Sequence, residues 1–105
     1  MTDLLTSKQR AFLRAMANTA DPILHVGKGE ISPAMIRQAD DALTARELFK
    51  GKTLETCALS AREAAESIAF EVNAEVVQVI GRSFVLYRRN DREPKIQLPR
   101  AQGKP

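Results

Sequence analysis

The sequence predicts an α/β fold, a compact sandwich in which three helices pack against a mixed four-stranded sheet. Three observations predict this fold. Helix-capping signals recur along the chain, short apolar runs alternate with them, and the chain closes on two β-branched runs that a glycine turn separates. The length of 105 residues, with 44% hydrophobic and 28% charged residues, fits one soluble domain with a single core.

The first helix and the first strand are predicted from a capping box and a proline. Residues 6–9, Thr-Ser-Lys-Gln, can cap a helix, and apolar residues then recur at helical spacing to about Asn18. Asp21-Pro22 ends this helix. The run "PILHV" at 22–26 is short and apolar, which is typical of a buried strand.

A glycine loop at 27–31 leads to the second predicted helix. Ser32 is a good N-cap, and Pro33 occupies the favoured first helical position. Apolar residues at helical spacing, with Ile36 and Leu43 among them, carry the helix to Arg46 or Glu47.

The stretch "ELFKGKTLE" at 47–55 predicts the second strand, although Gly51 disfavours it. Strand alternation places Phe49 on one face and both Lys50 and Lys52 on the other. A second capping box at 60–63 then opens the third helix, and Asn73 is suited to its C-cap.

The runs "EVVQVI" and "FVLYRR", separated by Gly-Arg-Ser at 81–83, predict a closing antiparallel hairpin. The predicted order is therefore helix, strand, helix, strand, helix, strand, strand, with a parallel arrangement in each strand–helix–strand unit. We expect residues 1–89 to form one domain and residues 90–105 to form a basic, mobile tail, in which Ile96 and Leu98 add a little extended structure. The aromatic residues are expected in the core: Phe12, Phe49, Phe70, Phe84 and Tyr87.

Charge is unevenly distributed along the chain, which has a net charge of +3 and a pI of about 9.4. Residues 53–81 carry a net charge of −4, whereas residues 82–105 carry +5. This polarity suggests an anionic partner such as nucleic acid, and a basic tail that aids solubility is the alternative. No stretch approaches the roughly 20 apolar residues of a membrane helix, and no secretory signal is visible, so we expect a cytoplasmic protein.

Residues that could support catalysis are few. His25 and Cys57 are the chain's single histidine and single cysteine, and no metal-ligand spacing is present. A hydrolase that pairs Cys57 with His25 is formally possible. We favour His25 as a strand residue and Cys57 as a small apolar residue, and we expect no enzyme activity, no cofactor, no metal and no small-molecule substrate.

The strongest local signal is the glycine loop in "HVGKGEISPAM" at 25–35. It lacks the Walker spacing and the third glycine of the dinucleotide fingerprint. Gly27 and Gly29 let the backbone come close to a partner, Lys28 adds a positive charge, and the following helix N-terminus favours an anion. Short GxxG loops clamp nucleotide backbones in some RNA-binding modules, and a structural turn is the equal alternative.

Five segments in this order carry a resemblance to a known family: "LTSKQRAFLRAMA", "ILHVGKGEIS", "ARELFKGK", "VQVIGRSFVLYRR" and "KIQLPR". Over roughly residues 5–89 the chain resembles the CRM domain family (chloroplast RNA splicing and ribosome maturation), particularly its stand-alone bacterial members. The resemblance implies a fold similar to the C-terminal domain of bacterial initiation factor three. It also implies RNA binding and association with precursors of the large ribosomal subunit.

The chain departs from the family at one position of the loop. The family pattern is G-x-x-G, and Glu30 stands at its fourth position, where a side chain restricts the backbone and a negative charge repels phosphate. Tyr87 is the one aromatic residue suited to base stacking, but we favour it as a packed strand residue. We therefore expect a monomer that reads RNA shape and backbone. Its predicted RNA-binding residues are Gly27, Lys28, Gly29, Lys8, Arg14, Lys50, Lys52, Arg82 and Arg88. The alternative is a protein-interaction adaptor that uses the acidic third helix, with Glu63, Glu66 and Glu71, and binds RNA incidentally.

Overall fold

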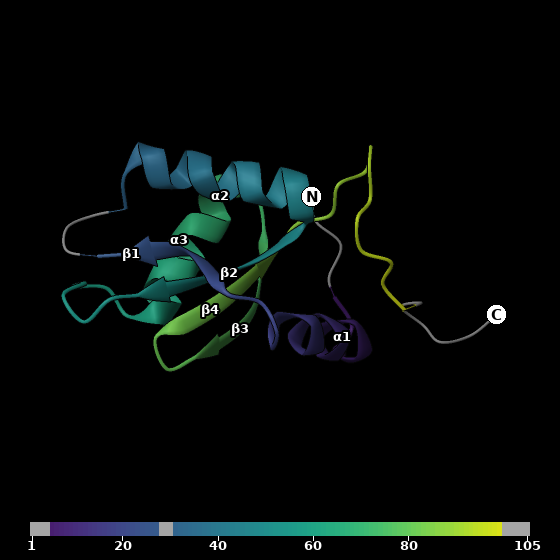
Figure 1. Cartoon of the computed structure of the whole chain (residues 1–105), viewed down its shortest axis with the longest axis horizontal. Helices are drawn as coiled ribbons and strands as arrows, with labels where there is room; N and C mark the ends of the chain where they lie inside the picture. Colours follow the sequence, from purple (N-terminus) through teal and green to yellow (C-terminus); the bar gives the residue numbers. More distant parts are fainter. Residues whose placement is uncertain (1–4, 28–30, 100–105) are drawn as a thin grey trace.

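The computed structural model describes residues 5–27 and 31–99, and it confirms the predicted α/β fold (Figure 1). All seven predicted elements are present, in the predicted order. They are α1 (Ser7–Ala17), β1 (Pro22–Val26), α2 (Pro33–Arg46), β2 (Leu48–Thr53), α3 (Ala61–Val72), β3 (Glu75–Ile80) and β4 (Ser83–Tyr87).

The predicted caps explain where the helices begin. Both capping boxes form, with Thr6 and Gln9 at α1 and with Ser60 and Glu63 at α3. At α2 the Ser32 hydroxyl accepts a hydrogen bond from the Met35 N–H. Each cap satisfies N–H groups that the first helical turn leaves without a backbone acceptor, so the sequence determines these helix starts locally.

The sheet has the strand order β1-β2-β4-β3. Strands β1 and β2 are parallel, as their connection through α2 predicts, and β4 is antiparallel to both of its neighbours. Strands β2 and β3 therefore run in the same direction, but β4 lies between them. The hairpin turn at 81–82 permits this return, because Gly81 adopts a positive φ of 57°.

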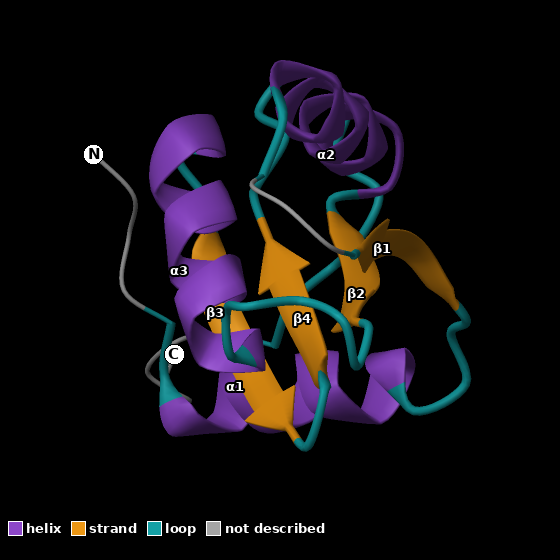
Figure 2. Ribbon diagram, turned by 90° about the vertical axis from the view of Figure 1, so that its left-hand side faces the viewer, coloured by secondary structure: helices purple, strands orange, loops and turns teal. Residues whose placement is uncertain are grey.

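Helices cover the two faces of the sheet unequally (Figures 1 and 2). Helices α2 and α3 pack on one face over the larger hydrophobic cluster, which includes Leu43, Phe49, Ile68 and Phe84. Helix α1 packs alone on the opposite face over a smaller cluster. That cluster consists of Leu13, Ala17, Leu48, Val77, Val85 and Tyr87.

The core prediction was correct for Phe49, Phe84 and Tyr87 and wrong for the other two aromatic residues. Phe70 is 85% exposed and Phe12 is 38% exposed. In both cases the helix buries a different side. Helix α1 turns only Leu13 and Ala17 to the sheet, and the buried side of α3 is made of Ala61, Ala64, Ala65, Ile68, Ala69 and Val72.

Gly51 lies in the middle of β2, directly opposite Phe84 of β4. Both residues are buried on the face that α2 and α3 cover. A Cβ atom at Gly51 would lie 2.4 Å from Cζ of the Phe84 ring. The ring therefore occupies the space that a side chain at position 51 would need, which explains a glycine inside this strand.

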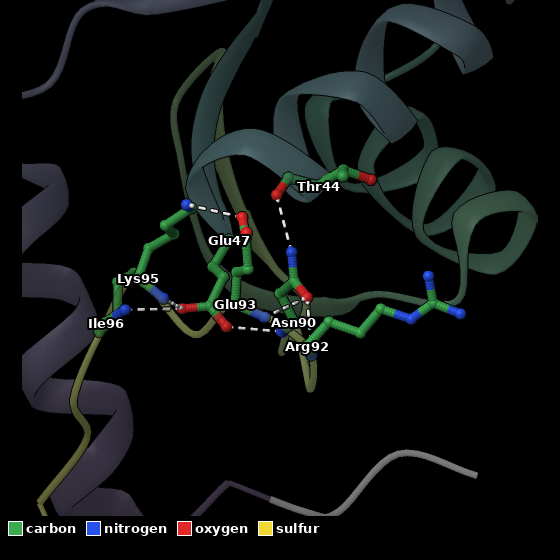
Figure 3. A network of polar contacts seen from close by, with 7 residues as sticks. All are labelled: Thr44, Glu47, Asn90, Arg92, Glu93, Lys95 and Ile96. Carbon is green, nitrogen blue, oxygen red and sulfur yellow. Dashed lines mark hydrogen bonds and ion pairs between the residues drawn. The ribbon is translucent and has the colours of Figure 1, made fainter.

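Residues 90–99 form no helix or strand, and they contact the end of α2 and the first turn of α1. Figure 1 shows this segment at the edge of the molecule. The buried carboxylate of Glu47 accepts hydrogen bonds from the backbone N–H groups of Asn90, Lys95 and Ile96 (Figure 3). The side chains of Ile96 and Leu98 pack on the cluster beneath α1. The intramolecular contacts thus continue from the predicted domain boundary at residue 89 to Pro99, whose carbonyl accepts a hydrogen bond from the Gln9 side chain.

Candidate nucleic-acid interface

The face of the sheet that carries α1 is covered at one end and open at the other. Along β2, Leu48, Lys50 and Lys52 point to this face, because Phe49 and Gly51 point to the other. Leu48 is buried in the cluster under α1, Lys50 is half-buried and Lys52 is exposed. Helix α1 therefore leaves the Lys52 end of this face open to solvent.

Strand pairing places polar residues on both sides of Lys52. Its partner in β1 is His25, which is exposed, and its partner in β4 is Ser83, which is half-buried. The prediction that His25 is a strand residue near the end of the sheet is confirmed. Sequence reasoning did not assign His25 to the interface, although its predicted strand and its position next to the glycine loop were a usable signal.

The end of β1, from which the glycine loop begins at Gly27, lies at the same end of the sheet as the hairpin turn (Figure 1). The Thr53 N–H donates to the Arg82 carbonyl at 2.8 Å, and the Leu54 N–H donates to the Val26 carbonyl at 2.8 Å. Gly27 follows Val26 directly, and a Cβ atom added to it would lie 3.3 Å from Leu54 Cδ1. The structure thus brings together Gly27, Lys52 and Arg82, which sequence reasoning had predicted separately.

Two of the predicted loop residues, Lys28 and Gly29, lie outside the described residues, as does Glu30. The structure describes the strand before these residues and the helix after them. Strand β1 ends at Val26, and α2 begins after the Ser32 cap with Pro33 in its first turn. This strand–loop–helix junction is the one predicted from the sequence.

The predicted basic residues of α1 lie over the other half of the same face. Lys8 and Arg14 are both exposed, on the helix that covers the Leu48 end. Arg10, which lies between them, has a structural role, because its Nη1 donates to the Val76 carbonyl at 2.9 Å and its Nη2 lies 3.7 Å from the Glu75 carboxylate.

Arg88 lies at the opposite end of β4 from the glycine loop, in a network within the protein. One guanidinium nitrogen, Nη1, donates to the Asp40 carboxylate at 2.7 Å and to the Val72 carbonyl at 2.8 Å. The other, Nη2, donates to the Asp40 carbonyl and to the Thr44 hydroxyl. Four of its five donors are therefore engaged in joining β4 to α2 and α3, and we leave Arg88 out of the interface proposed below.

Replacing Arg88 with lysine is expected to reduce the free energy of unfolding by about 1–2 kcal/mol, because an ammonium group cannot reproduce the forked contacts of a guanidinium group. Urea unfolding of the purified variant measures this loss. The affinity of the folded variant for RNA should stay the same. A marked loss of RNA affinity with unchanged stability would instead return Arg88 to the interface.

Tyr87 is buried beneath α1, so it is not available for base stacking. Burial raises the pKa of its hydroxyl above the ordinary value of 10.0, and the nearby Glu47 carboxylate raises it further. Among residues 5–27 and 31–99, no three histidine, cysteine or acidic side chains gather where they could hold a metal ion. No helix in the described part of the chain has the length and apolar character needed to cross a membrane.

Comparison with known proteins identifies the family. The profile of the CRS1/YhbY (CRM) domain matches residues 5–88. The chain belongs to the CRM domain family. The resemblance noted in the sequence is therefore confirmed, and the matched range includes every described element from α1 to β4.

Relatives of this CRM domain occur in bacteria and archaea. The chain is 40% identical over 96 residues to a Bacillus subtilis protein named "Probable RNA-binding protein YqeI". This alignment covers 91% of this chain and 100% of that protein. It is 33% identical over 96 residues to an "RNA-binding protein" of Haemophilus influenzae, and the alignment covers 91% of this chain and 96% of that protein. The solution structure of the Staphylococcus aureus protein SAV1595, described as a candidate RNA-binding protein, superposes with a TM-score of 0.72 at 39% identity, covering 91% of this chain and all of that one.

Proposed function

We propose that the chain is a non-enzymatic protein that binds structured ribosomal RNA during assembly of the large ribosomal subunit, in the cytoplasm. The relatives named as RNA-binding proteins support RNA as the partner. The observation that carries the proposal is that Gly27, where the glycine loop begins, lies with Lys52 and Arg82 at the open end of one sheet face. His25 and Lys50 extend this surface, which we call the open sheet face.

The proposed contact is with the sugar-phosphate backbone. Lys52 and Arg82 supply positive charge on exposed side chains, and Gly27 permits close approach of the main chain. The N-terminus of α2 adds the favourable end of a helix dipole beside the loop. Among the described residues of the open sheet face, His25 has the only exposed ring on which a base could stack, so we expect RNA shape to matter more than base sequence.

Crosslinking the protein to RNA in cells and sequencing the attached RNA tests the identity of this partner. We expect the crosslinked reads to concentrate on a structured region of large-subunit ribosomal RNA, in particles that sediment as precursors of that subunit. Reads that spread over messenger RNA or transfer RNA would still show RNA binding, but they would contradict the proposed role in subunit assembly.

Replacing Glu30 with glycine is expected to tighten RNA binding severalfold. The change restores the G-x-x-G pattern of the loop, widens the conformations open to its backbone and removes a negative charge from the proposed path of the phosphates. Titration of a labelled ribosomal RNA fragment measures the effect, with Glu93→Gly in the exposed C-terminal segment as the matched control. An affinity that stays the same or falls would show that the loop is not the clamp, so that the basic side chains alone hold the RNA.

A further inference from the structure

A groove lies on the side of the sheet that α2 and α3 cover, opposite the side to which Lys50 and Lys52 point. It has a volume of about 1000 Å³ and runs between the start of α2, the loop before α3 and α3 itself. Its apolar walls come from all three segments. The residues that form them are Ile31, Pro33, Ile36, Ala58, Leu59 and Phe70.

Phe70 is the unusual residue of this groove. Its side chain is 85% exposed, although α3 has an apolar side that packs fully against the sheet. The phenylalanine is therefore not needed to hold α3 in place. Large aromatic side chains that remain exposed beside other apolar residues are typical of surfaces that bind a partner.

Charge decides which kind of partner fits. The charged side chains among the described residues that line the groove are Glu66 and Glu71, and both are exposed. Arg62 lies 3.5 Å from the Glu66 carboxylate, but both partners are more than 60% exposed, and such a pair is weak. Two carboxylates beside an apolar groove repel phosphate and attract cationic groups, so this surface disfavours RNA.

We propose that this groove binds a basic, amphipathic segment of a protein partner. Two or three apolar side chains of the segment, at helical spacing, contact Phe70 and the groove walls, and its lysines or arginines lie beside Glu66 and Glu71. The volume is that of a site for a few side chains and not for a whole domain. The groove walls and the side chain of Lys52 lie on opposite sides of the sheet, and the first turn of α2 borders both surfaces. RNA bound on the Lys52 side therefore leaves Phe70 and the α3 wall of the groove accessible to a protein segment.

Fluorescence anisotropy with a defined peptide tests this inference on the full chain. The probe is a labelled 15-residue peptide with leucines at positions i, i+3, i+4 and i+7 and lysines elsewhere, compared with the same peptide carrying glutamine in place of lysine. We expect saturable binding of the lysine peptide and at least tenfold weaker binding of the glutamine peptide. No saturable binding up to millimolar concentration, or equal binding of the two peptides, would overturn the proposal.

Matched variants locate the binding site. Phe70→Ser should weaken the lysine peptide at least tenfold, and the double variant Glu66→Gln, Glu71→Gln should weaken it severalfold. Met16→Ser, which alters an apolar residue of α1 that is 39% exposed, and Asp41→Asn, which alters an exposed acid of α2, should leave it unchanged. An equal loss of peptide affinity in the control variants would overturn the proposed binding site. Circular dichroism establishes that each variant is folded.

An RNA titration separates this proposal from the proposed function. Phe70→Ser should bind a ribosomal RNA fragment as the unaltered chain does. If Phe70→Ser weakens RNA binding as well, the groove belongs to the RNA interface and the protein-segment proposal is wrong. If the peptide binds as expected while the chain binds no RNA, the groove proposal stands and the proposed function fails.

Discussion

Replacing Glu47 with glutamine is expected to lower the free energy of unfolding by about 2–4 kcal/mol, which is large for a change of one atom. Glu47 is fully buried, and its two carboxylate oxygens accept three backbone N–H groups from the C-terminal segment. Glutamine keeps one accepting oxygen and places an NH₂ group against at least one N–H donor. A donor then faces a donor in a buried site, where neither can turn to water.

Urea unfolding and amide hydrogen exchange measure this effect. The unfolding midpoint should fall, and the amides of Asn90, Lys95 and Ile96 should exchange faster because they have lost their acceptor. Glu93→Gln is the matched control, since Glu93 contacts the exposed ammonium group of Lys95 at 3.4 Å and should change the midpoint little. An unchanged midpoint in Glu47→Gln would show that the C-terminal segment does not contribute to the fold.

Replacing Gly51 with alanine is expected to lower the free energy of unfolding by about 1–3 kcal/mol, the range typical of an overpacked core. Alanine ordinarily suits a strand better than glycine, so propensity alone predicts the opposite sign. The added Cβ atom, however, lies within about 3 Å of three atoms of the Phe84 ring, and that ring is 1% exposed and cannot move into solvent.

A double-mutant cycle tests the cause of this loss. In a Phe84→Leu background the ring is gone, so adding Gly51→Ala should cost much less than it does in the unaltered chain. Purely additive effects of the two substitutions would show that the contact between position 51 and the ring is not the reason for the glycine.

Local chemistry in the sequence predicts the elements of this fold well. The two capping boxes and the Ser32-Pro33 start require residues close together in the chain, and all three are formed. The closing hairpin is equally local, since Gly81 supplies the positive φ that its turn requires. Pattern alone also predicted that Lys50 and Lys52 share one face of β2.

Contacts between distant segments explain what the sequence did not reveal. Glu47 ends α2 with a positive φ of 67°, where glycine or asparagine is usual, and its partners lie more than 40 residues away. Arg88 looked like a free basic residue because Asp40 and Thr44 are equally distant in the chain. Phe70 was expected in the core because its hydrophobicity was counted without knowing that small residues already fill the buried side of α3.

In the candidate interface, too, local pattern predicted single residues, whereas packing between distant segments decided how they are arranged. Alternation along β2 predicted that Lys50 and Lys52 share one face of the sheet. It could not predict that α1 packs over Leu48 and leaves Lys52 exposed, because that depends on how the helix packs on the sheet. The meeting of Gly27, Lys52 and Arg82 depends on strand order, which places β2 between β1 and β4. Each residue alone resembled a solvated charge or a turn, and their common location is what makes the surface a candidate.

Salt-dependent RNA affinity of two matched double variants tests the central claim most directly. Lys52→Ala with Arg82→Ala removes two charges from the open sheet face, whereas Arg46→Ala with Arg92→Ala removes two exposed charges elsewhere. With a large-subunit ribosomal RNA fragment, we expect the first variant to bind about tenfold more weakly. Its slope of log affinity against log salt should also fall by roughly 1.5, because each lost phosphate contact removes about 0.7–0.9. The second variant should match the unaltered chain in both affinity and slope. Equal losses in the two variants would contradict the account, because net charge and not the open sheet face would then bind the RNA.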